Sequence, residues 1–399
     1  MSEVIDAKQK YDLITKGLQE VLNGQIIQDI LEKENRPLKI YWGTAPTGRP
    51  HCGYFVPMVK IAHFLKAGCE VTVLLADMHA YLDNMKAPLE VVQYRAKYYE
   101  YIVKAMLTSI NVPIDKLIFV TGSSFQLQAD YTMDIFKLAN KVSQNDAKRA
   151  GADVVKQVDN PLLSGLIYPL MQALDEEHLK CDAQFGGVDQ RKIFVLAEEN
   201  LPGLGYKKRA HLMNKMVPGL AQGGKMSASD PNSKIDILED PKQVSKKIAK
   251  AFCAPGVVED NGLIAFIENV ILPIQELKQD KEDIFEFHIN RPEKFGGPIT
   301  YNSLQTLKDD FKSEKLAPAD LKIGVSDYIN ILLAPIREAF DANPEFQKAQ
   351  LEGYPVEVKE VKKQKVKKDK GNRYPGASAS KPETSPEDIT KSLNDAKIE

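Results

Sequence analysis

The sequence predicts an α/β fold built around a doubly wound parallel sheet. Short apolar segments typical of buried strands alternate with longer segments whose apolar residues recur at helical spacing, and this alternation favours a parallel sheet covered by helices. Mostly helical sequence interrupts the alternation near 123–175, as an insertion between two half-sheets would. After about Ile235 the strand signal ends, and segments bounded by prolines indicate a helical domain. Four parts are expected: a helical arm (1–36), an α/β domain with the insertion (37–234), a helical domain (235–352) and a tail (353–399).

The individual elements follow in order along the chain. The arm carries apolar residues such as Leu13, Ile14 and Leu18 at helical spacing. Strands are expected at 39–42, 71–75, 117–120 and 180–185, and helices at 55–67, 89–110 and 190–199. Gly68 ends the first of these helices, because glycine is favoured just past a helix C-terminus. Ligands of such sheets bind beyond the carboxyl ends of the strands, where Gly43 and Asp77 are expected.

The composition of the last part differs sharply from the rest. Between Lys359 and Lys370 the chain carries seven lysines and two acidic residues, and 371–381 is rich in Gly, Ser, Ala and Pro. Such a segment cannot bury enough apolar surface to offset its ordering entropy, so a solvated, disordered tail is expected. Its lysines would still attract phosphate groups.

Bulk properties exclude several classes of protein. The 399 residues carry a formal net charge of −2, so any surface that binds nucleic acid must come from local basic patches. No segment resembles a signal peptide or approaches the length of a membrane span. The four cysteines, Cys52, Cys69, Cys181 and Cys253, are isolated and lack the spacing of zinc ligands. These features predict a cytoplasmic protein with reduced thiols, no membrane association and no protein-bound metal site.

The first motif that carries chemistry is the Gly/Pro-rich segment 46–54. It follows the apolar run 40–42 and begins a helix, so His51 is expected where a helix N-terminus can receive a polyphosphate. Gly53 lets a nucleotide approach the backbone, because a Cβ there would obstruct it. Taken alone, His51 is better explained as a histidine that caps the helix.

The second motif is the flexible segment 223–229. Its Lys225, with the hydroxyls of Ser227 and Ser229, can follow the charge that develops on the β- and γ-phosphates of a nucleotide. Taken alone, Lys225 is better explained as a solvated lysine in a loop. Together and in this order, the two motifs predict an enzyme that transfers an adenylyl group from ATP to a carboxylate, a reaction that needs positioning and charge stabilisation.

The two motifs resemble the His-x-Gly-His and Lys-Met-Ser-Lys-Ser motifs of class I aminoacyl-tRNA synthetases. From about Leu38 to Leu351 the chain resembles the eukaryotic and archaeal type of tyrosyl-tRNA synthetase, especially its fungal cytoplasmic branch, and segments such as 66–71 and 184–192 match beyond the motifs. The resemblance implies a Rossmann-like catalytic domain, a helical anticodon-binding domain and a homodimer. It also implies a tyrosine–tRNA ligase that forms tyrosyl-adenylate from L-tyrosine and ATP, with Mg²⁺, and then charges the 3′ end of tRNA(Tyr).

The motifs depart from the family pattern at two positions. Tyr54 stands in place of the second histidine, and Ala228 in place of the second lysine. Neither side chain supplies a cation, so phosphate neutralisation is expected to depend on Mg²⁺ and Lys225. The resemblance assigns catalysis to His51, Gly53, Lys225, Ser227 and Ser229, and ATP binding to Gly43, Thr47, His51, Gly53 and Lys225.

Polar residues on one helical face point to the amino acid substrate. Tyr168, Gln172 and Asp175 are spaced i, i+4 and i+7 within a mostly apolar run, although the polar side of an amphipathic helix would look the same. The resemblance implies that Tyr41 and Asp175 hold the phenol of tyrosine, and that Tyr168, Gln172 and Gln190 surround its α-amino group. Physically, a carboxylate that accepts the phenolic proton would be left unsatisfied by phenylalanine.

Two further groups of residues are expected to bind tRNA. Arg149, Arg191 and Lys192 lie in segments that resemble those reading the first acceptor base pair, and arginine suits guanine edges. Phe295 and Asp320 match positions that stack on and hydrogen-bond an anticodon base. The alternatives are ordinary surface charge for the three cations and core packing for Phe295.

Three rival functions remain open from the residues alone. A tryptophanyl-tRNA synthetase shares the architecture, but an indole offers one donor and needs a wider slot than Tyr41 and Asp175 would form. A catalytically silent RNA-binding relative would not need His51, Gly53 and Lys225. A small nucleotidylyltransferase shares the first motif but does not explain the C-terminal helical domain.

Overall fold

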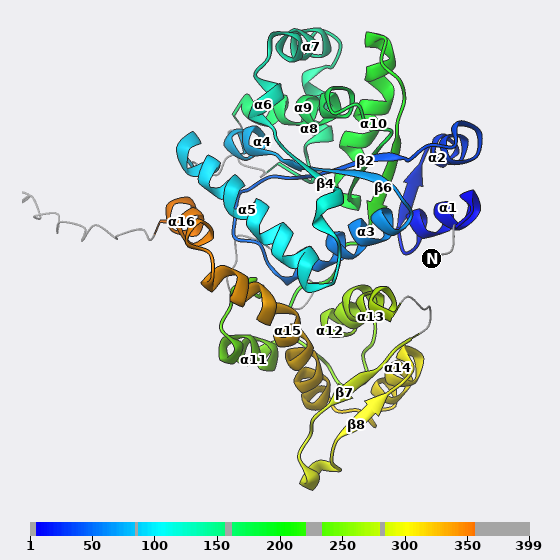
Figure 1. Cartoon of the computed structure of the whole chain (residues 1–399), viewed down its shortest axis with the longest axis vertical. Coiled ribbons are helices and arrows are strands. Elements are labelled where there is room, and N and C mark those ends of the chain that lie inside the picture. Colours follow the sequence, from blue (N-terminus) through cyan, green and yellow to red (C-terminus); the bar gives the residue numbers. More distant parts are fainter. Residues whose placement is uncertain (1–4, 84–86, 156–161, 221–233, 280–283, 356–399) are drawn as a thin grey trace, which may run out of the picture. The chain divides into compact units, whose positions relative to one another are not determined.

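The computed structural model describes residues 5–83, 87–155, 162–220, 234–279 and 284–355 (Figure 1). Met1–Pro355 forms one compact unit, and the second unit, Val356–Glu399, lies outside the described residues. The disordered tail expected from composition therefore stays a prediction.

The main sheet determines where the site lies. Among the described residues it has six strands in the order β1-β6-β5-β2-β3-β4. These are β1 (Glu20–Leu22), β2 (Lys39–Thr44), β3 (Glu70–Leu75), β4 (Leu117–Thr121), β5 (Ala183–Gly187) and β6 (Ala210–Asn214). All neighbours pair in parallel except β1, which runs antiparallel to β6. The sheet reverses its strand order between β2 and β5, and an open α/β sheet binds its ligands at such a point.

Helices cover both faces of this sheet. The arm contributes α1 (Ala7–Thr15) and α2 (Gly24–Asp29), and the α/β part contributes α3 (Phe55–Lys66), α4 (Asp77–Leu82), α5 (Leu89–Ser109), α6 (Ser123–Gln126), α7 (Ala129–Ala139), α8 (Gln144–Ala150), α9 (Ser164–His178) and α10 (Arg191–Asn200). In Figure 1, α3 and α5 lie on one side of the sheet and α9 and α10 on the other. Strand residues alternate accordingly: Ile40 and Trp42 join the buried cluster of α3 and α5, whereas Tyr41 faces the opposite side.

The C-terminal part of the described chain is mostly helical. It contains α11 (Pro241–Lys250), α12 (Gly262–Phe266), α13 (Leu272–Gln279), β7 (Phe287–Ile289), β8 (Ile299–Tyr301), α14 (Leu304–Lys312), α15 (Pro318–Asp341) and α16 (Pro344–Gly353). One-turn or π-helical segments supplement the helices: η1 (Ile30–Glu34), η2 (Cys52–Tyr54), η3 (Ile114–Lys116), η4 (Val188–Gln190), η5 (Leu201–Leu204), η6 (Ile267–Ile271) and η7 (Glu293–Phe295).

The expected strands and helices are confirmed within a few residues, with three corrections. The arm is not wholly helical, because its β1 pairs with β6 at the sheet edge. The strand β6 was not expected at all. The expectation that no strand follows Ile235 is also wrong, because β7 and β8 form an antiparallel pair. Strands of three residues are too short to display an alternating pattern, and β6, buried at every position, shows none.

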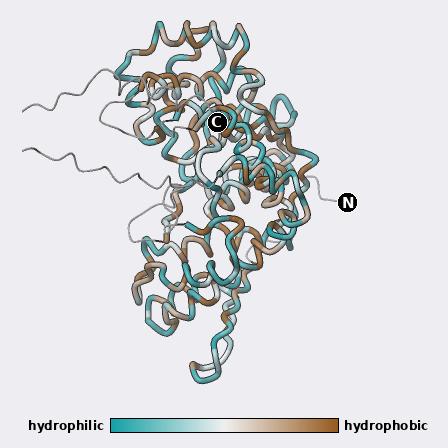
Figure 2. Tube along the Cα trace, turned by 90° about the vertical axis from the view of Figure 1, so that its left-hand side faces the viewer, coloured by the Kyte–Doolittle hydropathy of each residue, from teal (hydrophilic) through white to brown (hydrophobic). Residues whose placement is uncertain are grey.

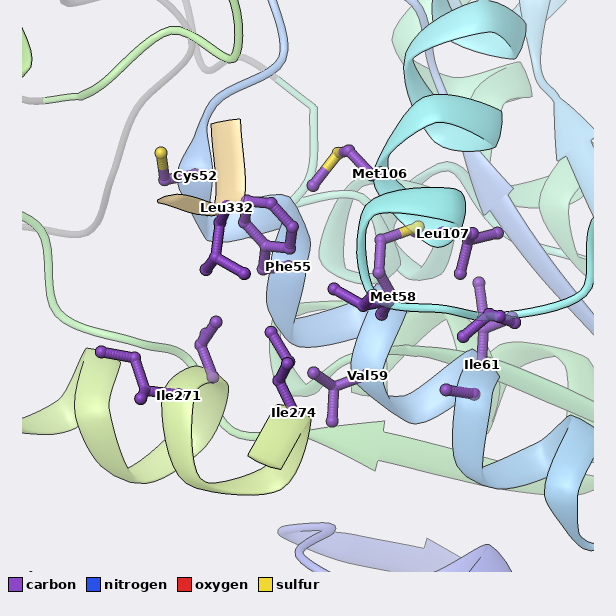
Figure 3. Packing of buried hydrophobic residues seen from close by; sticks show 14 of the residues in the cluster. Cys52, Phe55, Met58, Val59, Ile61, Met106, Leu107, Ile271, Ile274 and Leu332 are labelled. Carbon is purple, nitrogen blue, oxygen red and sulfur yellow. The ribbon is translucent and has the colours of Figure 1, made fainter. Parts of the chain in front are cut away.

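One buried apolar cluster contains residues from both sides of Ile235. Figure 3 shows part of it: Phe55, Met58 and Val59 come from α3, Met106 and Leu107 from α5, and Ile271, Ile274 and Leu332 from the C-terminal part. Apolar and polar residues alternate along the chain in Figure 2. In keeping with this, no helix among the described residues is long and apolar enough to cross a bilayer.

Candidate active site

A cavity beside β2 gathers the residues expected to bind tyrosine. It encloses about 370 Å³ and is lined by Tyr41, Gly43, Ala45, Leu74, Ala76, His79, Tyr168, Gln172, Asp175, Gln184 and Gln190. The strands β2, β3 and β5 supply its floor, and α4, α9 and η4 supply the rest. All five residues predicted around the substrate therefore meet at one place. We call this the small cavity.

Asp175 is the most unusual group in the small cavity. Its side chain is 0% exposed, and its Oδ1 accepts hydrogen bonds from Gln126 Nε2 at 2.7 Å and from the Tyr131 hydroxyl at 2.8 Å. Its Oδ2 has no hydrogen-bond partner among the described residues. Burial raises the pKa of Asp175 to about 7, against the lowering effect of the two hydrogen bonds. An acceptor with this degree of burial calls for a donor that the described residues do not supply.

The other predicted residues line the remaining wall. The Tyr41 hydroxyl donates to the Gln172 carbonyl at 3.3 Å, and Gln172 Nε2 donates to Gln190 Oε1 at 2.8 Å. Gly186, at the end of β5, must lack a Cβ, because one would lie 2.6 Å from Gln190 Oε1. Tyr41 of β2 is thus bonded to the backbone of α9, and the side chains of Gln172 in α9 and Gln190 in η4 are bonded directly to each other.

Three residues around Asp175 were missed by the sequence reasoning: Gln126, Tyr131 and His79. The first two lie in the helical insertion and contact Asp175 across 49 and 44 residues of chain, respectively. His79 follows the carboxyl end of β3, and that position alone was a usable signal.

A larger cavity adjoins the small one and contains the first motif. It encloses about 1420 Å³, and its lining includes Gly43, Thr47, His51, Gly53 and Tyr54. Both cavities share Gly43, Ala45, Tyr168 and Gln190 in their walls. A substrate in the small cavity would therefore meet one in the larger cavity at the carboxyl end of β2.

His51 is a neutral donor at the start of a helix. Its Nδ1 accepts the Gly53 backbone N–H at 3.2 Å, so the ring proton lies on Nε2. Burial, with a smaller effect from the charge of Lys234, lowers the pKa of His51 to about 4. His51 can therefore cap the helix through Nδ1 and donate to a ligand through Nε2, because the two roles use different ring nitrogens. The alternative that the sequence offered is compatible with the predicted role.

The backbone of the first motif is held at three consecutive carbonyls. Arg95 donates to Thr47 at 2.9 Å, and Lys234 donates to Arg49 at 2.9 Å. Between them, the Gly48 carbonyl accepts from two hydroxyls, Tyr99 at 2.6 Å and Tyr354 at 2.9 Å. These anchors come from α5, from the segment before α11 and from the end of α16.

Tyr54, which replaces the second histidine, packs among aromatic rings. Its ring meets His51 edge-on at 5.4 Å, and its hydroxyl lies 3.4 Å from Thr44 Oγ1 and 3.5 Å from the Tyr99 hydroxyl. The second motif, with Lys225, Ser227, Ala228 and Ser229, lies outside the described residues.

Comparison with known proteins identifies the family. The model of the family "tRNA synthetases class I (W and Y)" matches residues 33–334. The cytoplasmic tyrosine–tRNA ligase of Saccharomyces cerevisiae is 73% identical over 375 residues, which are 94% of this chain and 95% of the yeast protein. The chain belongs to the tyrosine–tRNA ligases.

Two further comparisons agree. The cytoplasmic tyrosine–tRNA ligase of Danio rerio is 55% identical over 89% of this chain, which spans 65% of the length of the zebrafish protein. A structure described as tyrosyl-tRNA synthetase complexed with L-tyrosine from Archaeoglobus fulgidus has a TM-score of 0.74 at 38% identity, covering 84% of this chain and 99% of that one. The predicted resemblance and the class I synthetase fold are confirmed, and ATP, L-tyrosine and tRNA(Tyr) are the substrates of such a ligase.

The cations that the ligase was expected to direct at the tRNA acceptor end all have carboxylate partners. Arg149 pairs with Asp146 at 3.1 Å, Arg191 with Glu20 at 2.8 Å and Lys192 with Asp153 at 2.7 Å. All three cationic side chains are about half exposed or more, up to 73% for Arg149. Surface pairs of this kind contribute little stability, so an RNA phosphate or base could displace the carboxylates.

The two residues expected at the anticodon differ in their surroundings. Phe295 is 61% exposed, so the alternative that it fills the core is wrong. Asp320 is mostly buried, and Arg291 Nη1 donates to its Oδ2 at 3.3 Å. Arg291 also donates to the Gly297 carbonyl at 2.7 Å, so it links the start of α15 to the loop that carries Phe295.

Proposed function

We propose that the small cavity binds the side chain of tyrosine and the larger cavity binds ATP. The observation that carries this proposal is the buried Asp175 carboxylate, whose Oδ2 lacks a donor among the described residues and belongs to the wall of the small cavity. The phenolic proton of tyrosine is a donor of the right kind. The shared wall around Gly43, Tyr168 and Gln190 then brings the tyrosine carboxylate to the α-phosphate.

Specificity for tyrosine over phenylalanine follows from the hydrogen bonds that phenylalanine cannot form. Without a phenolic hydroxyl, Asp175 Oδ2 stays buried without a donor, and a second contact at Tyr41 is also lost. Tyrosyl-tRNA synthetases are themselves the standard example of this effect, with phenylalanine rejected by about 10⁴–10⁵. Tyr168, Gln172 and Gln190 are proposed to surround the α-amino group.

The first motif is proposed to act on the phosphates. His51 donates from Nε2 to a phosphate oxygen, Gly53, Thr47 and Gly43 allow close approach of the nucleotide, and Lys225 with Ser227 and Ser229 follows the charge that moves to pyrophosphate. Because adenylyl transfer needs no acid, base or covalent enzyme intermediate, these contacts suffice for the protein's part. Mg²⁺ enters as the ATP complex and neutralises phosphate charge, as it usually does with one or two protein ligands at most.

The remaining assignments concern tRNA and assembly. The C-terminal part, 235–352, reads the anticodon through Phe295 and Asp320, and Arg149, Arg191 and Lys192 contact the acceptor end. The enzyme works in the cytoplasm, as its relatives' names state. It is a homodimer that uses the helical insertion, where large apolar side chains are exposed; these are Leu127, Met133, Phe136, Leu162, Leu163 and Ile167.

The pocket assignment is tested by pyrophosphate exchange with different amino acids. Wild type should exchange with tyrosine alone among the twenty. Asp175→Ala should lower kcat/KM for tyrosine far more than for phenylalanine, because only tyrosine uses the carboxylate. Asp134→Ala is the matched control. Asp134 is a buried aspartate of α7 that is hydrogen-bonded to Tyr206 and His178, and it does not line either cavity. Equal losses for both amino acids in Asp175→Ala would assign Asp175 a structural role.

A further inference from the structure

The small cavity holds a second unpaired polar atom beside Asp175. His79 is 2% exposed and lines the cavity, and its Nε2 has no hydrogen-bond partner among the described residues. This nitrogen lies 3.6 Å from Asp175 Oδ2, which is beyond hydrogen-bond distance. Two buried polar atoms thus lie close to van der Waals contact without a hydrogen bond between them.

Gln126 determines which nitrogen of His79 carries the proton. Its Nε2 donates one hydrogen to Asp175 Oδ1 at 2.7 Å and lies 3.5 Å from His79 Nδ1. The opposite amide orientation would bring its Oε1 against the carboxylate, so the N–H side must face both groups. His79 Nδ1 is therefore the acceptor, and its Nε2 carries the hydrogen.

His79 is uncharged in this setting. Burial lowers its pKa to about 4, so the ring is neutral at physiological pH. The edge of the Tyr168 ring packs against it at 4.7 Å between centroids, which fixes the ring's position in the wall. A neutral ring with one hydrogen on Nε2 is a donor only at that atom.

We propose that His79 is a specificity-determining residue that donates from Nε2 to the phenolic oxygen of bound tyrosine. A phenol both donates and accepts, so a single oxygen that lies to one side of the pair, within hydrogen-bond distance of both atoms, satisfies Asp175 Oδ2 with its proton and His79 Nε2 with a lone pair. The Tyr41 hydroxyl already donates to the Gln172 backbone carbonyl, so His79 adds a donor to Tyr41 and Asp175, the two groups proposed to hold the phenol. This inference rests on the proposed function of the small cavity.

The test uses an analogue that donates but accepts poorly. In 4-aminophenylalanine an N–H can bond Asp175, whereas the nitrogen lone pair is delocalised into the ring and cannot receive the His79 proton. The readout is the ratio of kcat/KM for tyrosine to that for 4-aminophenylalanine in pyrophosphate exchange. Because both values come from one preparation, the ratio does not depend on the fraction of folded enzyme.

His79→Leu should lower this ratio about tenfold, as expected for the loss of one buried hydrogen bond to the preferred substrate. His79→Gln places an amide N–H near the former Nε2 and should restore most of the ratio. His63→Leu is the matched control, because His63 is also buried with an unpartnered ring nitrogen among the described residues but lies on α3 outside both cavities. It should leave the ratio unchanged.

An unchanged ratio in His79→Leu, or equal losses for both amino acids, would overturn the role of His79. The same series run on Asp175→Ala separates this failure from a wrong pocket assignment. If Asp175→Ala lowers kcat/KM for tyrosine far more than for phenylalanine and His79→Leu does not alter the ratio, only the histidine inference fails. If Asp175→Ala affects all three amino acids equally, the proposed pocket fails with it.

Discussion

At the scale of single residues, the site depends on buried polar groups that the protein itself leaves incompletely paired. Asp175 is held on one oxygen by Gln126 and Tyr131, and its other oxygen has no partner in the described part of the chain. Such a group destabilises the free enzyme, because desolvation of a carboxylate is only partly repaid by two hydrogen bonds. The selectivity for tyrosine that we propose for Asp175 is therefore obtained at the expense of folding stability.

Asp175→Asn should consequently stabilise the fold near neutral pH while impairing tyrosine activation. The carboxyl titrates near 3.8 in a model peptide and at about 7 here, so the folded state holds an extra proton between these values. The stability that this proton contributes is present at acidic pH and is lost as pH rises from about 4 to about 7. Urea unfolding should show the variant more stable than wild type by about 1 kcal/mol or more at pH 8, with a smaller difference at pH 5. A less stable variant at pH 8 would contradict this account.

At the scale of elements, the structure separates two kinds of residue that the sequence placed together at the anticodon. Phe295 lies exposed in the connection between β7 and β8. Asp320, in contrast, lies in the first turn of α15 and is paired with Arg291. The exposed ring of Phe295, which has the Lys294 ammonium 4.8 Å from its centroid, can stack on a base with little rearrangement. Asp320 can read a base edge only by giving up or sharing Arg291.

Phe295→Ala should impair charging of tRNA and leave pyrophosphate exchange near wild type. A stacked base contributes about 1–3 kcal/mol, so kcat/KM for tRNA should fall by one to two decades. Ile331→Ala is the matched control, because Ile331 is a similarly exposed apolar residue on α15. Parallel losses of charging and exchange in Phe295→Ala would make the loop a support of the catalytic part and end the anticodon assignment.

At the scale of the whole molecule, the helical insertion has apolar residues on two sides. In α7, Tyr131 and Leu138 are buried, while Met133 and Phe136 are more than half exposed and lie three residues apart on another face. An exposed face of this kind on a soluble protein is typical of an interface. Because α7 also supplies Tyr131 to Asp175, an interface there would rest directly on the element that shapes the small cavity.

Phe136→Glu, alone or with Met133→Glu, should convert the enzyme from dimer to monomer. A charge placed in a desolvated apolar contact costs several kcal/mol, enough to dissociate most interfaces of ordinary size. Sedimentation velocity over a range of concentrations measures the change, with Leu351→Glu as a control at an exposed apolar position on α16. A wild-type enzyme that sediments as a monomer would refute the homodimer, and dimeric Phe136→Glu would move the interface elsewhere.

The sequence alone determined the α/β class, most strands and helices, and part of the residues that line the two cavities. These features are local: strand and helix periodicities, the turn at 46–54 and the i, i+4, i+7 spacing of Tyr168, Gln172 and Asp175 are all contained in short segments. The resemblance then supplied the roles of residues that the patterns could only single out.

Only the tertiary structure decided what surrounds Asp175. Gln126, Tyr131 and His79 come from three different helices. Only His79, which follows the carboxyl end of β3, carried a usable signal, and nothing in the segments of Gln126 and Tyr131 marks them as neighbours of Asp175. The pairing of β1 with β6 and of β7 with β8 was equally hidden, because pairing depends on where the chain returns and not on the composition of three residues. Whether a buried polar atom is satisfied is a property of all the elements packed around it. For that reason the unpaired atoms of Asp175 and His79, on which the choice of substrate is proposed to depend, appear only once the chain is folded.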